Sequence, residues 1–269
     1  METQDETRRR WDAAAPGWEA EREVVAAVNA PVTAALVAAL DPQPDDIVLD
    51  LAGGTGDLVE VLAGRVARTV ATDLSPAMVE AARRRGIPNA EHRVLDMQAI
   101  DLPDESVDLA VCRFGLMLVS DPALALREIR RVLRLGGRLA FATWAPAKEN
   151  PWATAYGPVL LERGLLEPPK PGEPGQFALS DPGEITALVR NSGFGSTCVE
   201  EVAVEYRFAS WDDYRRVVTG LAAALRETLG QLDEQTVAEV DEAARLRLER
   251  FRGEEGYVIP GLALVTRAS

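Results

Sequence analysis

The sequence predicts an α/β protein built on a doubly wound, mostly parallel sheet with helical segments covering it. Between about residues 45 and 145, short β-branched runs alternate with helical patterns, which is typical of parallel βαβ units. In the first unit an apolar run ends at Asp50 and passes into a loop of glycine and other small residues. That βα loop is where open α/β sheets bind nucleotides. At 269 residues, with 47% hydrophobic and 27% charged residues, the chain is long enough to bury a large core.

Five strands are predicted in this core, at residues 47–51, 69–73, 92–95, 107–114 and 138–144. Their periodicity supports the strands themselves but not their order in the sheet. Residues 198–208 alternate as a further strand, with an irregularity expected near Glu200. Residues 257–266 form the last strand, where Pro260 and Gly261 predict an edge position or a bulge.

Helices are predicted between the core strands. The first has an apolar face of three residues, Leu58, Val61 and Leu62. The next starts at Ser75, which can cap it, with Pro76 at its first position. A third helix covers residues 122–133 and stops before Gly136.

The chain as a whole divides into four parts. They are an N-terminal helical cover (1–44), the core (45–145), a lid excursion (146–180) and the remainder of the core sheet with a helical insertion at about 210–252 (181–269). The lid excursion is a segment expected to run over the sheet without a strand or a long helix, because seven prolines lie between Ala145 and Pro174. In the last part, residues 181–191 form a helix with Ser180 as the expected N-cap.

Charge and cysteine content exclude several classes of function. A net charge of −14 opposes nonspecific binding to nucleic acid or anionic lipid. Residues 24–40 are apolar but are expected to be too short and interrupted to span a membrane, and no secretory segment is evident, so a cytoplasmic protein is predicted. Cys112 and Cys198 are expected to be buried free thiols, and no metal site is predicted.

Three carboxylates stand at the ends of successive predicted strands and point to a nucleoside ligand. Asp73 can accept hydrogen bonds from both hydroxyls of a ribose; the alternative is that it only caps the following helix. Asp96 can accept from an adenine amino group; the alternative is a surface turn. With Asp50 at the end of the first strand, the three together are a stronger signal than any one. Val59 stands where dinucleotide folds need a small residue, which disfavours a nicotinamide oxidoreductase.

The runs at residues 48–57, 108–119 and 126–139 resemble the class I S-adenosylmethionine-dependent methyltransferases, and in particular the ubiquinone/menaquinone-biosynthesis-like (methyltransferase type 11) group. The resemblance covers about residues 45–145. It implies a Rossmann-like sheet of seven strands with an antiparallel last strand, and S-adenosyl-L-methionine as the cofactor.

The resemblance also implies which residues bind that cofactor. Those near its methionine end are Asp50, Ala52, Gly54, Gly56 and Arg113; those near the ribose are Asp73 and Leu74; those near the adenine are Asp96 and Met97. Ala52 departs from the family, which usually has glycine there, and a positive φ at this position would strain an alanine. The runs 126–133 and 138–141 are interpreted as core, with no chemistry assigned to them.

The predicted reaction is methyl transfer to a small, apolar or aromatic molecule, with O- or C-methylation favoured. In-line displacement needs mainly positioning and exclusion of water, so no catalytic residue is assigned, and His92 is interpreted as structural. Candidates for covering the substrate are the aromatic residues Trp18, Trp144, Trp152 and Tyr156. The alternative is a non-methylating cyclase or partner protein that keeps the cofactor structurally. The apolar side of the last helical segment can pack on the core, cover the pocket or form a homodimer.

Overall fold

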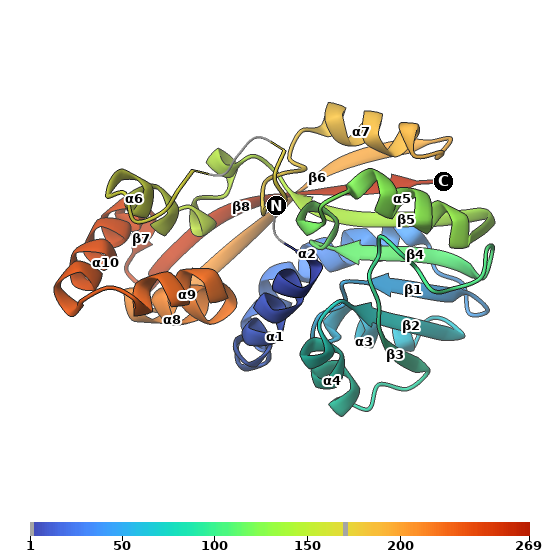
Figure 1. Ribbon diagram of the computed structural model, residues 1–269, viewed down its shortest axis with the longest axis horizontal. Coiled ribbons are helices and arrows are strands. Elements are labelled where there is room, and N and C mark those ends of the chain that lie inside the picture. Colours follow the sequence, from blue (N-terminus) through green and yellow to red (C-terminus); the bar gives the residue numbers. More distant parts are fainter. Residues whose placement is uncertain (1–2, 169–171) are drawn as a thin grey trace.

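The computed structural model describes residues 3–168 and 172–269, which form one mixed sheet with helices on both faces (Figure 1). Its strands are β1 (Ile47–Leu51), β2 (Arg68–Asp73), β3 (Ala90–Val94), β4 (Val107–Arg113), β5 (Leu133–Trp144), β6 (Thr197–Phe208), β7 (Arg252–Gly253) and β8 (Gly256–Ala268). They lie in the order β3-β2-β1-β4-β5-β8-β6, and β7 pairs with β8 off this path. β1 to β5 are parallel, whereas β8 is antiparallel to β5 and β6. The predicted fold class is confirmed, with the two-residue β7 in addition.

Helices surround the sheet and extend it at one end. They are α1 (Gln4–Ala20), α2 (Arg22–Leu40), α3 (Asp57–Ala63), α4 (Pro76–Arg84), α5 (Pro122–Val132), α6 (Tyr156–Glu162), α7 (Pro182–Asn191), α8 (Trp211–Leu221), α9 (Ala223–Gly230) and α10 (Glu234–Leu248). In Figure 1, α6 and α8 to α10 gather around the far end of the β6–β8 pair, away from the parallel strands. The four-part division of the chain stays a prediction.

In β4, successive side chains point to opposite faces of the sheet, and both faces are buried. Leu109 and Val111 belong to the apolar cluster that includes α2, α6 and α10. Ala110 and Cys112 belong to the cluster on the other face, which includes α5 and α7. Because successive residues of this central strand face opposite sides and both sides are covered, nearly every residue of the run is apolar.

The last strand is more regular than its sequence predicts. β8 pairs with β6 without a break, and Pro260 lies opposite Glu205. The irregularities expected at Pro260 and near Glu200 are therefore wrong. Pro260 is tolerated because β5 pairs with β8 only from Ala263 onward, so no strand on that side needs its missing N–H.

Three local predictions also need correction. The buried face of α3 contains Val59 with Leu58 and Leu62, whereas Val61 is 40% exposed. Asp181, not Ser180, caps α7 by accepting from two backbone N–H groups. Cys198 is an exposed thiol, while Cys112 is buried as expected.

α2 is the one helix among the described residues that is long and apolar enough to cross a membrane, with a mean hydropathy of 1.8. The expectation that its segment is too short and interrupted is wrong, because Pro31 lies inside a continuous helix. In the fold, one face of this helix packs against the sheet through Val28, Val32, Leu36 and Leu40.

α1 lies across the end of the sheet toward which the arrows of β1 and β4 point (Figure 1). Asp12 accepts from the Ser75 hydroxyl (2.5 Å) and the Ala77 N–H (3.1 Å), which joins α1 to the start of α4. On its other side α1 touches α8 backbone to backbone: a Cβ on Gly17 would lie 1.9 Å from the carbonyl oxygen of Gly220. α1 thus contacts α4, beside the parallel strands, and α8, in the group of helices around the far end of the β6–β8 pair.

Candidate active site

A cavity of about 630 Å³ lies beneath α1, at the carboxyl ends of the parallel strands. Eight of the nine residues predicted to bind the cofactor line it: Asp50, Ala52, Gly54, Asp73, Leu74, Asp96, Met97 and Arg113. Gly56 does not line it. It begins α3 with a φ of 88°, and a Cβ there would lie 3.1 Å from that of Ala82, so its role is close packing against α4.

The loop after β1 is fixed to the end of β2. The Gly53 N–H donates to the carbonyl of Thr72 (2.8 Å), and the Gly54 N–H donates to Asp73 Oδ2 (3.0 Å). Gly54 has a φ of 55°, and a Cβ there would meet no described atom within 4 Å. The backbone of this loop therefore faces the cavity with open space in front of it.

Asp73 is held by the backbone rather than used as a helix cap. Its Oδ1 accepts from the Ser75 N–H (2.9 Å) and its Oδ2 from the Gly54 N–H, while Ser75 itself caps α4. Burial raises the pKa of Asp73 to about 6 against the opposing effect of these N–H groups, and the charge of Asp12 adds to the rise. Each carboxylate oxygen keeps lone pairs for a ligand, because each accepts only one of these backbone bonds.

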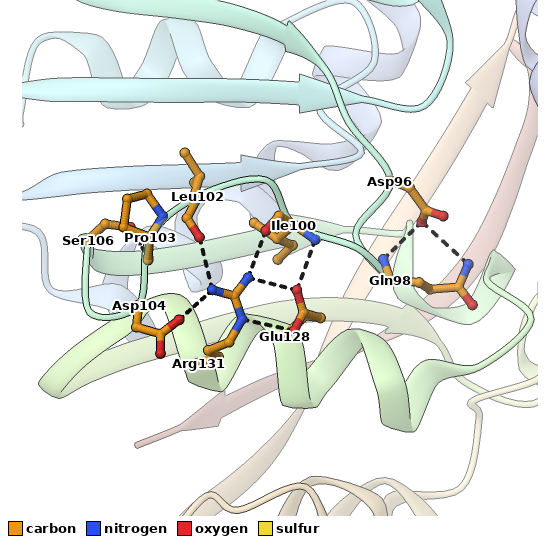
Figure 2. Close-up of polar contacts among 9 residues, drawn as sticks. All are labelled: Asp96, Gln98, Ile100, Leu102, Pro103, Asp104, Ser106, Glu128 and Arg131. Carbon is orange, nitrogen blue, oxygen red and sulfur yellow. Dashed lines mark hydrogen bonds and ion pairs between the residues drawn. The ribbon is translucent and has the colours of Figure 1, made fainter.

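Asp96 lies two residues beyond β3 and faces α1. Its Oδ1 accepts from the Gln98 N–H (2.9 Å), as Figure 2 shows, and its Oδ2 accepts from the Gln4 side chain (2.6 Å). Met97 beside it is buried. The Asp96 carboxylate is thus oriented from its own loop and already receives an amide N–H on the cavity side.

Asp50 and Arg113 place a carboxyl group and a guanidinium at the inner end of the cavity. Asp50 is fully buried, and neither of its oxygens has a hydrogen-bond partner among the described residues. Burial raises its pKa to about 8, although the nearby charge of Arg113 works the other way. The Arg113 guanidinium donates to the Thr33 hydroxyl (2.8 Å) and lies 3.8 Å from Asp57.

Ala52 has a φ of 54°, the positive value that strains an alanine and that the sequence alone could neither predict nor exclude. Its Cβ takes the space that a side chain on Gly115 would need: a Cβ on Gly115 would lie 2.4 Å from that of Ala52 and 2.9 Å from Cys112 Sγ. The family's glycine has therefore been exchanged for alanine opposite a residue that has no side chain.

The contact between residues 52 and 115 predicts that substitutions at the two positions have non-additive effects on the free energy of unfolding. Gly115→Ala is expected to lower the free energy of unfolding by about 2 kcal/mol through overpacking. Ala52→Gly alone should change it by less than about 1 kcal/mol, because relief of the left-handed strain is offset by backbone entropy. The double variant should recover part of the loss, measured by denaturant unfolding of all four proteins. Strictly additive effects would contradict the contact.

The four candidates for covering the substrate separate into two groups. Trp18 lines the cavity, and its indole N–H donates to the Leu221 carbonyl (3.1 Å). The other three, Trp144, Trp152 and Tyr156, are buried in the core and do not line it. Their aromatic character predicted a cover, but Trp144 and Trp152 instead stack behind Phe114 and Tyr206, with ring centroids of neighbours 4.1–4.9 Å apart.

Phe114, Asn29 and Gln4 line the cavity although the sequence did not single them out. Phe114 stacks on Trp144 and has a φ of 63°, a strained value for an aromatic residue that sits at a functional cavity. Asn29 is 6% exposed, and its Oδ1 has no partner among the described residues. A signal existed for Asn29: it is a polar residue in an apolar helix, one turn before Thr33, which holds Arg113.

Comparisons with known proteins show which family and which folds this chain is similar to. Residues 49–141 match the sequence model of a family described as a methyltransferase domain. A curated relative, the ubiquinone/menaquinone biosynthesis C-methyltransferase UbiE of Hydrogenovibrio crunogenus, is 38% identical over 122 residues, which are 42% of this chain and 48% of that protein. The chain thus spans about half the length of the curated relatives it matches.

Solved structures share the fold over most of the chain. The YcgJ protein from Bacillus subtilis has a TM-score of 0.59 at 18% identity, covering 88% of this chain and 96% of that one. The [4+2]-cyclase SpnF has a TM-score of 0.57 at 17% identity, covering 96% of both chains. Together with the family match, these structures confirm the resemblance of the core and the Rossmann-like fold that it implies.

Proposed function

We propose that this chain is a class I S-adenosylmethionine-dependent methyltransferase that transfers a methyl group to a small, apolar or aromatic molecule, because residues 49–141 match the methyltransferase-domain model and the UbiE relative is 38% identical over 122 residues. S-adenosylmethionine is the cofactor of this family. One observation carries the proposal: three acidic side chains from the ends of neighbouring strands, Asp50, Asp73 and Asp96, line a single cavity.

The residues in the cavity fit the parts of this cofactor. Asp73 offers two carboxylate oxygens to the two ribose hydroxyls, and Asp96 offers an acceptor to the adenine amino group. At the inner end, Asp50 has two oxygens without a partner among the described residues, beside the cationic Arg113. An acid and a guanidinium side by side suit an amino acid, which carries an ammonium and a carboxylate.

One part of the remaining cavity wall suits an apolar acceptor. It comes from Trp18, Phe114, Leu118, Val119 and the stretch Leu221–Ala224, whereas polar residues such as Thr7, Ser120 and Gln176 line other parts. The bound cofactor supplies an activated methyl group, so this chain has only to align the acceptor with it and exclude water. His92 is not among the lining residues, which favours catalysis by positioning over a histidine base. The printed name of the UbiE relative supports C-methylation, with O-methylation also compatible with the lining.

Calorimetric titration with S-adenosylmethionine and S-adenosylhomocysteine tests the cofactor part of the proposal. Binding of both at one site per chain is expected, and no heat of binding for either would overturn it. Methyl transfer is then followed with isotopically labelled cofactor and two acceptors, a demethylated naphthoquinol and a simple catechol. Labelled product at ring carbon or at oxygen decides between C- and O-methylation.

A second candidate is a cyclase that binds the cofactor without using its methyl group. The fold similarity to the [4+2]-cyclase SpnF over nearly the whole chain favours keeping it. The two candidates differ in cofactor turnover: a methyltransferase accumulates S-adenosylhomocysteine when its acceptor is added, whereas a cyclase leaves the cofactor intact.

We also propose that the protein works in the cytoplasm, without membrane insertion or nucleic-acid binding. The net charge of −14 supports the absence of membrane and nucleic-acid binding, since it repels the phosphates of nucleic acid and anionic lipid headgroups. The apolar side of α10 packs on the core through Val240, Ala244 and Leu248, so it is not free to form a homodimer. A homodimer through another surface is also proposed, and light scattering of the purified chain measures it.

A further inference from the structure

The segment between β3 and β4, residues 95–106, holds Asp96 and Met97 but contains no helix or strand of its own. Its position must therefore come from contacts with other elements. The sequence assigned the run 126–133 to core packing alone. Leu126, Ile129 and Val132 are buried as that requires, but two polar residues of the same helix contact this segment.

Arg131 of α5 joins the helix to the segment at several points (Figure 2). Its Nη1 donates to the Leu102 carbonyl (2.9 Å) and Asp104 (2.6 Å), and its Nη2 donates to the Ile100 carbonyl (2.7 Å). Glu128, one turn earlier, accepts from Arg131 Nε (2.9 Å) and Nη2 (2.8 Å). The fork of the guanidinium is thus fixed by one carboxylate while it binds two carbonyls of the segment.

Two further contacts complete the attachment. Glu128 Oε2 accepts from the Ile100 N–H (3.0 Å), so Ile100 is held at both its N–H and its carbonyl. At the other end of α5, Gln98 Oε1 accepts from the Ser120 hydroxyl and the Asp121 N–H, both at 2.9 Å. Residues 98–100, which come directly after Asp96 and Met97, are therefore attached both to the start of α5 and to its last turn.

We propose that Arg131, oriented by Glu128, is a positioning residue for recognition of the adenine ring. It does not line the cavity, and it acts by fixing the segment from which Asp96 reaches it. Loss of Arg131 leaves two carbonyls without their donor and two carboxylates, Glu128 and Asp104, without their shared counter-ion. The segment then relaxes, and the Asp96 carboxylate loses its alignment with the 6-amino group. The inference rests on the proposed function, because Asp96 is the adenine acceptor only if the chain binds the adenosyl cofactor.

The test compares two ligands that differ at the position Asp96 would read. S-adenosylhomocysteine has a 6-amino donor, and its inosine counterpart has a carbonyl oxygen there. The wild-type chain should prefer the adenine ligand by about tenfold or more, as expected for a hydrogen bond to a carboxylate. In Arg131→Met the preference should fall to about twofold or less, because binding of the adenine ligand weakens while binding of the inosine ligand changes little.

Arg134→Met is the matched control. Arg134 lies three residues away and donates from one nitrogen to both oxygens of Asp108 (2.6 Å each), but it does not contact the segment. This variant should keep the wild-type preference. Arg131→Lys should show an intermediate preference, because an ammonium keeps the charge without the fork.

The outcomes separate the inference from the proposed function. If wild type binds neither ligand, the proposed function fails. If wild type prefers adenine and Arg131→Met prefers it equally, the inference is overturned. Should Arg131→Met not fold, Glu128→Gln gives the same readout: it keeps the side-chain length and one acceptor, and a wild-type preference in this variant also overturns the inference.

Discussion

Asp73→Ala is expected to weaken binding of S-adenosylhomocysteine by about 2–3 kcal/mol, roughly a 30- to 150-fold rise in Kd. The reason is that both carboxylate oxygens of Asp73 are oriented by backbone N–H groups and keep lone pairs toward the cavity. Alanine removes the acceptors of two ribose hydroxyls together. Calorimetry of the two proteins at pH 8 measures the change.

Glu80→Ala is the control for this experiment, since it removes a carboxylate from α4 that forms an exposed ion pair with Arg83. Its affinity should equal that of wild type. A Kd for Asp73→Ala within about twofold of wild type would remove Asp73 from the ribose site.

The same residue predicts a pH dependence of binding. The pKa of Asp73 is about 6 in the free protein, and hydroxyl donors from a ligand favour its charged form. Below pH 6 binding therefore releases a proton from Asp73, so the contribution of this residue to affinity should fall as the pH drops below 6. Asp73→Ala should lose this dependence.

Asp50→Asn is expected to stabilise the free chain at alkaline pH, with an effect that grows from pH 4 to pH 8. The pKa of Asp50 is raised from 3.8 to about 8 because its carboxyl is fully buried. Between those values the folded chain keeps this proton and the unfolded chain releases it. The free energy of unfolding of wild type therefore falls with rising pH by up to about 1.4 kcal/mol per unit, and levels off above pH 8.

Denaturant unfolding of wild type and Asp50→Asn at pH 5, 7 and 9 measures the difference directly. Comparing the two proteins cancels the titration of all other groups. The difference should rise with pH in the absence of ligand, and a constant difference would show that Asp50 does not hold its proton.

Binding should change in the opposite direction. A cationic ligand group beside Asp50 favours its charged form, so Asp50→Asn should bind S-adenosylhomocysteine more weakly than wild type while being more stable at pH 9. We therefore expect Asp50, whose oxygens have no hydrogen-bond partner among the described residues, to lower the stability of the free chain above pH 4 and to strengthen binding of the ligand.

The sequence predicted those parts of the site that depend on local order. Asp50 and Asp73 lie at the carboxyl ends of β1 and β2, and Asp96 follows β3. Because the carboxyl ends of parallel strands meet at one edge, the strand prediction placed all three at that edge, although it did not give the strand order. The glycines of the first loop belong to the same local pattern.

Parts of the site that depend on distant contacts were not predictable in this way. Gln4 meets Asp96 across 92 positions of sequence, and no local pattern pairs them. Trp144 and Trp152 were expected over the substrate because aromatic type was the only signal, whereas their direction follows from stacking on Phe114 and Tyr206. Glu128 and Arg131 were missed because the apolar stripe of their helix explained the run without them.

The contact between Ala52 and Gly115 has a consequence for the history of this chain. Ala52 and Cys112 Sγ together crowd the place of a side chain at 115, so any larger residue there lowers stability and glycine at 52 relieves only part of that crowding. Homologues with alanine at 52 should therefore retain glycine at 115.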